Sequence, residues 1–366
     1  MHRRAPPRRR WPARRASGRR LGAMSSRAKP SVRAPRWRSW FFGLIVAAAL
    51  FGAVAHWGEV EAFARLVGQA QPGWLLVAIA LQLSTYASVA KSWSQVLERA
   101  GTPRKLPQLM RIAIAKLFAD QALPSAGMGG NVILVDQLRS IGVARGTAVA
   151  ALLISMIGYY AVYALFALLM LVLLWFHDRA TPVMAGLVTL FLCVAVAIPS
   201  LALWLRGRAS KPLPPSLQRL AFLRSLAGSI AQAPGDLLRD RRLLVRVATW
   251  NGMIFLADAA TLFACLHALG TSASPATCFI ALIMASIVVT LGPVPLGLGS
   301  FEATSTATLR VLGVPLEAAF AGTMLLRLLT LWAPLIPGMI LMRGAARNKA
   351  RLTSRHGTPP AGGRHS

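Results

Sequence analysis

Long apolar runs, separated by short polar or basic segments, make up most of the chain. A helix needs about 20 mainly apolar residues to cross a bilayer. Runs that approach or exceed this length cover residues 40–57, 74–93, 147–176, 182–205, 244–269 and 318–342. The run at 147–176 is longer than needed and predicts a tilted or bent helix. We therefore predict an all-α polytopic membrane protein with about six full spans.

A further apolar run, 277–289, leads into the stretch LGPVPLGLGSFE at residues 291–302. Prolines here remove backbone donors and glycines loosen the backbone, so the helix must break. The residues that predict this break are Pro293, Pro295, Gly297 and Gly299. Non-helical backbone at membrane depth survives only inside protein or beside a water-filled cavity. Glu302 ends the stretch, and a broken segment with a charge is typical of binding sites in transporters.

A second Pro/Gly-rich stretch, LPSAGMGGN at 123–131, follows an amphipathic run at 106–122 that could lie in the interface or dip into the membrane and return. The two stretches belong to motifs at 123–143 and 294–314 that align without gaps at an offset of 171 residues. The matched pairs include Pro124 with Pro295, Asn131 with Glu302, Arg139 with Arg310, and Gly142 with Gly313. If both breaks are re-entrant, three spans separate them and the second copy is inverted. We predict an inverted internal repeat with two re-entrant segments, the first opening to the cytoplasm and the second to the exterior.

Basic residues gather at both ends of the chain. Residues 1–39 contain fourteen Lys and Arg and no acid, and residues 343–366 contain six and no acid. Such tails could bind nucleic acid through its phosphates, but basic segments also mark the cytoplasmic side of a membrane and contact anionic lipids. We favour the membrane interpretation, with no specific nucleic acid as partner. It predicts a bacterial inner-membrane protein with both termini in the cytoplasm.

The same pattern divides the chain into three parts. We expect residues 1–39 to be a disordered basic tail, residues 40–343 to be the transmembrane domain, and residues 344–366 to be a second basic tail. Met24 is an alternative start within the first tail. The run at 40–57 also resembles a signal peptide, but its length and the spans that follow favour a first membrane helix.

Ionisable residues in apolar runs are the candidates for function, because a charge in the membrane is costly unless it is paired or hydrated. Glu302 and Arg327 could form a structural ion pair. Alternatively, Arg327 could bind a lipid phosphate with its planar guanidinium while Glu302 tunes or releases the ligand. Arg139 and Arg310 follow the two breaks and could either extend to the interface or bind headgroups on opposite leaflets.

The remaining candidates are weaker. Backbone amides of the break glycines could bind phosphate, and Asn131 stands where the other copy has Glu302. These glycines are Gly129, Gly130, Gly297 and Gly299. Asp258, inside a predicted span, could be structurally paired or coupled to protons, and Lys116 and Asp120 are expected at the interface.

No pattern predicts a catalytic site, a metal or a cofactor. The histidines lie in the tails or at span ends without metal-ligand spacing, and no phosphate-loop motif is present. The three cysteines are isolated in apolar runs and are expected to be small buried hydrophobes: Cys193, Cys265 and Cys278.

Three segments resemble a known family. PLGLGSFE at 295–302, LGVP at 312–315 and LLRLLTLW at 325–332 are similar to the C-terminal signature of the flippase-like membrane domain of lysylphosphatidylglycerol synthases. That signature pairs a Pro/Gly loop ending in Glu with a later intramembrane Arg. Residues 123–139 resemble the family's first motif, and the whole resemblance covers roughly residues 40–345.

The resemblance implies that the chain moves lipids between leaflets. Free-standing members, some associated with hopanoid metabolism, lack the synthase catalytic domain. Because only 24 residues follow Met342, we expect no aminoacyl transfer here. Two departures affect the first copy: Asn131 stands where the family often has Glu, and Met156 where it often has Arg.

We therefore predict an inner-membrane lipid transporter, of flippase or scramblase type, for anionic or polar-headgroup lipids. Its expected partners are membrane lipids and lipid-biosynthesis enzymes. The alternatives are a membrane-embedded lipid-modifying enzyme and a non-transporting scaffold for lipid biosynthesis.

Overall fold

The described part of the chain is helical. The computed structural model describes residues 68, 70–122, 128–176, 182–207, 234–292, 294, 297–334 and 337, all within the unit of residues 58–366. Over these residues the elements are α3 (Pro72–Arg99), α4 (Leu106–Ala122), α5 (Met128–Ser140), α6 (Arg145–Phe176), α7 (Pro182–Gly207), α10 (Gly235–Arg239), α11 (Arg241–Ala268), α12 (Pro275–Leu291), α13 (Ser300–Val311), α14 (Leu316–Arg327) and the π-helix η2 (Leu328–Trp332). The predicted all-α class is confirmed for this part.

In the described part of the chain, four helices are long and apolar enough to cross a membrane: α3, α6, α11 and residues Pro182–Leu201 of α7. They account for the spans predicted at 74–93, 147–176, 182–205 and 244–269. Large apolar side chains remain exposed along α3, α6 and α7, among them Leu76, Leu83, Leu165, Trp175, Val183 and Val196. An apolar surface of this kind indicates contact with lipid. The predicted span at 40–57 and both basic tails lie outside the described residues.

The last predicted span, 318–342, begins as the short helix α14 and continues as η2. In η2 the amide of Ala333 donates to the carbonyl of Leu328, five residues earlier, at 2.8 Å. This wider turn starts directly after Arg327, and π-type turns are frequent at functional sites.

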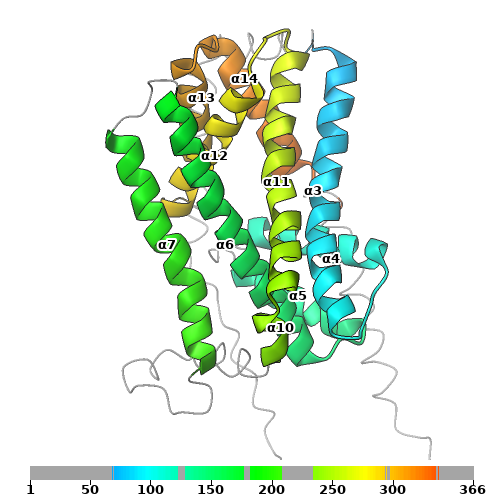
Figure 1. Cartoon of the computed structure of the whole chain (residues 1–366). Helices are drawn as coiled ribbons and strands as arrows, with labels where there is room; N and C mark the ends of the chain where they lie inside the picture. The colour runs from blue at the N-terminus through cyan, green and yellow to red at the C-terminus, as the bar shows by residue number, and fades with distance from the viewer. Residues whose placement is uncertain are drawn as a thin grey trace, which may run out of the picture. The chain divides into compact units, whose positions relative to one another are not determined.

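Helices α3 and α11 pack side by side in opposite directions (Figure 1). At one end, the Gln71 amide donates to the Ala268 carbonyl at 2.8 Å. At the other end, Arg99 Nε donates to Asp240 Oδ2, also at 2.8 Å. Asp240 Oδ1 caps α11 by accepting from the first backbone amides of that helix. The Arg99 hydrogen bond and these amides lower the pKa of Asp240.

Two broken helical hairpins occupy opposite ends of α6 and α11 (Figure 1). The α4–α5 hairpin shares a core with residues 148–154 of α6 and with the first turns of α11. The α12–α13 hairpin shares a core with residues 162–174 of α6 and with residues 255–266 of α11. The long helices therefore hold the two hairpins apart.

The first break is shorter than the sequence suggested. The sequence predicts Asn131, Gly129 and Gly130 in the break, but they belong to the first turn of α5, which begins at Met128. Glycine is permissive rather than incompatible with a helix, so it ends a helix only where the surroundings require it. Pro124, like Pro293 and Pro295, lies outside the described residues.

Candidate functional site

The second break, between α12 and α13, has the backbone that its glycines predicted. Gly297 and Gly299 have φ angles of +63° and +81°, in the left-handed region that side chains disfavour. A Cβ atom at Gly297 would also overlap the side chain of Val289. Both features require glycine at position 297, so the chain can turn tightly from α12 into the start of α13 at Ser300.

Glu302 lies in the first turn of α13, and each of its carboxylate oxygens has a partner. Oε2 accepts a hydrogen bond from the Gly299 amide at 2.7 Å, which is half of a capping box. Oε1 accepts from Arg327 Nε, also at 2.7 Å. A carboxylate at this position is further stabilised by the positive end of the helix dipole.

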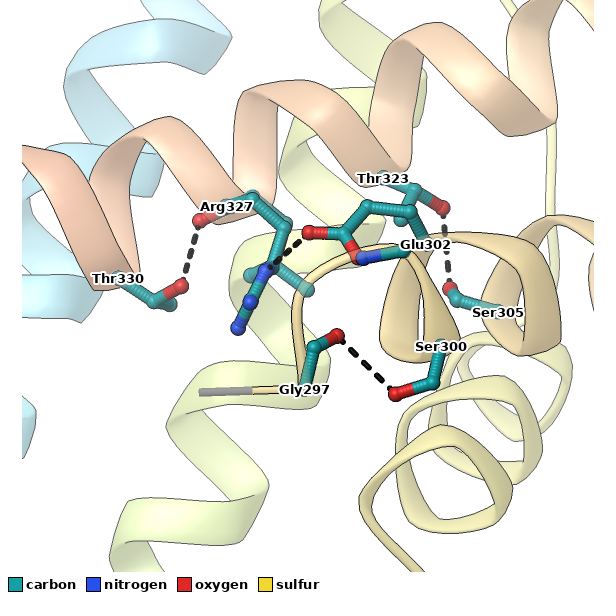
Figure 2. A network of polar contacts seen from close by, with 9 residues as sticks. Gly297, Ser300, Glu302, Ser305, Thr323, Arg327 and Thr330 are labelled. Carbon is teal, nitrogen blue, oxygen red and sulfur yellow. Dashed lines mark hydrogen bonds and ion pairs between the residues drawn. The ribbon is translucent and has the colours of Figure 1, made fainter. Parts of the chain in front are cut away.

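Arg327 is the last residue of α14 and reaches Glu302 across the gap between the two helices (Figure 2). Both side chains are only 11% exposed. The guanidinium also lies over the ring of Phe301, 4.8 Å from its centroid, in a cation–π contact. The predicted ion pair is therefore present, and it leaves neither buried charge uncompensated.

Buried hydroxyl groups continue this polar region between α13 and α14. The hydroxyls of Ser305 and Thr323 are 3.0 Å apart (Figure 2), and both side chains are fully buried. Thr306 and Thr308 are buried on α13 as well. Neither hydropathy nor charge singles out these residues, although the Ser/Thr-rich segment directly after the break is a signal in the sequence.

The first break has a charged pair in a different place. Lys116 Nζ and Asp120 Oδ2, one turn apart on α4, are 2.6 Å apart. Asp120 Oδ1 accepts from the Gly130 amide at 3.0 Å, and a Cβ atom at Gly130 would overlap that carboxylate. The side chains of Lys116 and Asp120 are 25% and 21% exposed. The sequence predicts an interfacial position for both residues but not their contacts, through which Asp120 joins α4 to the start of α5.

The other predicted residues do not join either charged pair. Arg139 and Arg310 are exposed in the last turns of α5 and α13. Asn131 is half-buried near the start of α5. Within the described ranges, no three His, Cys, Asp or Glu side chains gather where they could bind a metal ion.

Comparison with known proteins agrees with the architecture. A family profile described as lysylphosphatidylglycerol synthase TM region matches residues 40–338. A search of curated proteins finds no match. The matched region includes both hairpins, both charged pairs and the four candidate spans. The chain is a membrane protein that belongs to the family of the lysylphosphatidylglycerol synthase transmembrane region, and this membership connects it to lipid metabolism.

Proposed function

We propose that this protein moves lipids with anionic or polar headgroups between the leaflets of the bacterial inner membrane, as a flippase or scramblase. The headgroup would pass between the two broken hairpins while the acyl chains stay in the bilayer. The observation that supports this most strongly is a pair of matched hairpins at opposite ends of the same long helices.

The first two helices of the two proposed halves have equal lengths. Helices α3 and α11 each have 28 residues, and α4 and α12 each have 17. After the second helix of each hairpin comes a glycine with a positive φ, +83° at Gly142 and +95° at Gly313. The amides of these glycines donate to the carbonyls of Arg139 and Arg310, each at 3.0 Å. Such agreement in length and turn geometry supports an internal repeat.

The packing supports inversion of the second half. The first helices of the two halves, α3 and α11, are antiparallel, and the hairpins share cores with opposite ends of α6 and α11. Inverted repeats with broken helices are a recurring plan of transporters, with the substrate site where the repeats meet. Arg139 and Arg310 would then lie near opposite membrane surfaces and attract anionic headgroups there.

The charged pairs supply chemistry suited to a phosphate. Each hairpin has a carboxylate that lies beside a cation and accepts from a glycine amide near the start of the hairpin's second helix. The cation is on the same helix in the first hairpin (Lys116) and comes from α14 in the second (Arg327). We infer that Glu302 compensates Arg327 while no lipid is bound and that a headgroup phosphate competes for the guanidinium, whose planar donors suit phosphate oxygens. Lys116 and Asp120 would have the same role in the first hairpin and replace the charges absent at Asn131 and Met156.

The proposal places both basic tails in the cytoplasm, beside anionic headgroups. It assigns no catalytic step to the chain. Membrane lipids are its partners, together with enzymes that make them.

The decisive experiment is reconstitution into phosphatidylethanolamine–phosphatidylglycerol vesicles that contain trace acyl-labelled fluorescent phosphatidylglycerol. Dithionite added outside quenches only the outer leaflet, so protein-dependent quenching beyond that fraction reports movement. Glu302→Gln and Arg327→Ala should slow it, whereas the exposed controls Glu317→Gln and Arg246→Ala should not. No acceleration by the wild type would refute the proposal, and unchanged rates in folded Glu302 and Arg327 variants would reduce the pair to a structural role.

Inversion is tested separately by cysteine labelling. Ser140 and Val311 are exposed at matched positions after the two hairpins. In a background without Cys193, Cys265 and Cys278, Ser140→Cys and Val311→Cys should react with a membrane-impermeant maleimide from opposite sides. Reaction of both from one side would contradict the inverted repeat.

A further inference from the structure

Asp258 is a half-buried acid near the middle of α11 whose Oδ1 atom is buried, and the proposed site does not use it. It lies ten residues before Ala268, the end of the helix, and at 1.5 Å per residue this is about 15 Å from that end. Its neighbour Gln82 lies ten residues after the start of α3 at Pro72. Because the hydrocarbon core is about 30 Å thick, both side chains are placed near its midplane.

This pair has more hydrogen-bond acceptors than donors within reach. Asp258 Oδ1 and Gln82 Oε1 are both buried without a hydrogen-bond partner among the described residues. Gln82 Nε2 donates to the hydroxyl of Thr85 at 3.2 Å, and that hydroxyl donates to the Gln82 carbonyl at 2.7 Å. Two neighbouring side chains therefore each have an acceptor oxygen that lacks a donor, although buried polar atoms are normally paired.

The described neighbouring helices bring no counter-ion to Asp258. The titratable groups near it are the phenols of Tyr86 on α3 and Tyr159 on α6. Helix α12 has only Cys278 as a titratable residue, and on α14 Glu317 is exposed while Arg327 pairs with Glu302. The charges of α10 lie beside the opposite end of α11.

An ionised carboxylate without a counter-ion is costly at this depth. A bound proton removes the charge and also creates an O–H donor for an oxygen that lacks one. The same side chain would become an ion again only when water reaches it. Helix α3 leads into the first hairpin and α11 leads into the second, so movement of one half against the other would shear the α3–α11 interface that contains Asp258.

We propose that Asp258 is a proton-binding site that couples lipid movement to the proton gradient. Its carboxylate takes one proton from water on one side of the membrane, and the carboxylic acid returns that proton to water on the other side as the halves rearrange. One proton crosses for each cycle, and no bond other than O–H forms or breaks. This inference rests on the proposed lipid movement and adds its energy source.

The first test measures fluorescent phosphatidylglycerol in both leaflets of reconstituted vesicles, with and without a pH gradient and with the membrane potential clamped. With one proton per lipid, a gradient of one pH unit sustains up to about a tenfold difference between leaflets. Asp258→Asn should abolish this difference, Asp258→Glu should retain part of it, and Asp136→Asn, at an exposed acid on α5, should leave it unchanged. If the wild type moves lipid to the same distribution with and without the pH gradient, the proposed coupling is refuted.

The second test does not depend on transport. Hydrophobic carbodiimides modify protonated carboxyl groups in apolar surroundings, so wild-type protein should gain one adduct at Asp258, located by peptide mass spectrometry. Raising the pH should reduce the adduct, and Asp258→Asn should remove it, whereas Glu302→Gln should not. If the wild type moves no lipid, the transport proposal fails, but the adduct still reports on proton binding. An unmodified Asp258 would refute the proton site itself.

Discussion

The Glu302–Arg327 pair predicts a large and strongly non-additive loss of stability when one charge is removed. Nε and Oε1 are 2.7 Å apart, and each side chain is 11% exposed, so little water can replace a missing partner. In Arg327→Leu the carboxylate would keep only the Gly299 amide. Removing one partner of a buried pair costs about 3–5 kcal/mol, and we expect that loss in the free energy of unfolding.

Removing both charges should cost less than removing Arg327 alone. The double variant Glu302→Gln/Arg327→Leu leaves no buried ion, and buried pairs replaced together are often nearly neutral. Glu302→Gln alone should fall between the two, because the Phe301 ring still faces the guanidinium and contributes about 0.5–2 kcal/mol. The expected pattern is therefore a coupling energy of several kcal/mol, on the scale of the larger single loss.

The assay is denaturant unfolding in mixed micelles, followed by tryptophan fluorescence for the wild type, the two single variants and the double variant. Lys91 and Glu98 provide a matched control pair, since they are 3.7 Å apart and 36% and 47% exposed. Exposed pairs are worth about 0–1 kcal/mol, so the control cycle should show little coupling. Losses at Glu302 and Arg327 that simply add, each as small as in the control, would refute the reasoning.

Three further predictions test the breaks and the end of the α3–α11 interface. Gly130→Ala should lower the free energy of unfolding by about 1–3 kcal/mol because a Cβ atom has no room there, whereas Gly186→Ala, in open space on α7, should be neutral or stabilising in the same unfolding assay. Gly297→Ala should reduce the folded fraction in size-exclusion chromatography, because the left-handed backbone alone costs about 1–2 kcal/mol and the Cβ atom would also overlap a neighbour. Because the pKa of Asp240 is lowered, the contribution of its carboxylate to folding stability is complete above the ordinary aspartate range and is lost as the pH falls through the lowered value. Thermal melts of wild type and Arg99→Ala should therefore differ at neutral pH and converge in acid.

Local features of the sequence predicted most of the secondary structure. Apolar runs at 147–176, 182–205 and 244–269 agree closely with the helices Arg145–Phe176, Pro182–Gly207 and Arg241–Ala268. Hydropathy succeeds here because a spanning helix must be apolar over its whole length. The break before Ser300 was also predictable, since the backbone at Gly297 and Gly299 disfavours other residues.

Features that depend on contacts between helices were harder to predict from the sequence. The glycines before Asn131 resembled a break, yet they start α5, because Asp120 accepts the Gly130 amide from the facing helix. The apolar run after Ala318 was predicted as one span, but it changes to a π-helix after Arg327. Neither feature is visible in hydropathy, which averages over windows longer than one turn.

The sequence by itself therefore determined the membrane class, most of the helices and the break before Ser300, because hydropathy and backbone permissiveness are properties of single residues. The tertiary structure decided which charges meet. Glu302 finds Arg327 25 residues away, Asp120 pairs within its own helix, and Asp258 lies beside Gln82 on the antiparallel helix. A charge in apolar surroundings must be paired or neutralised, but only the packing of helices that are distant in the sequence selects its partner.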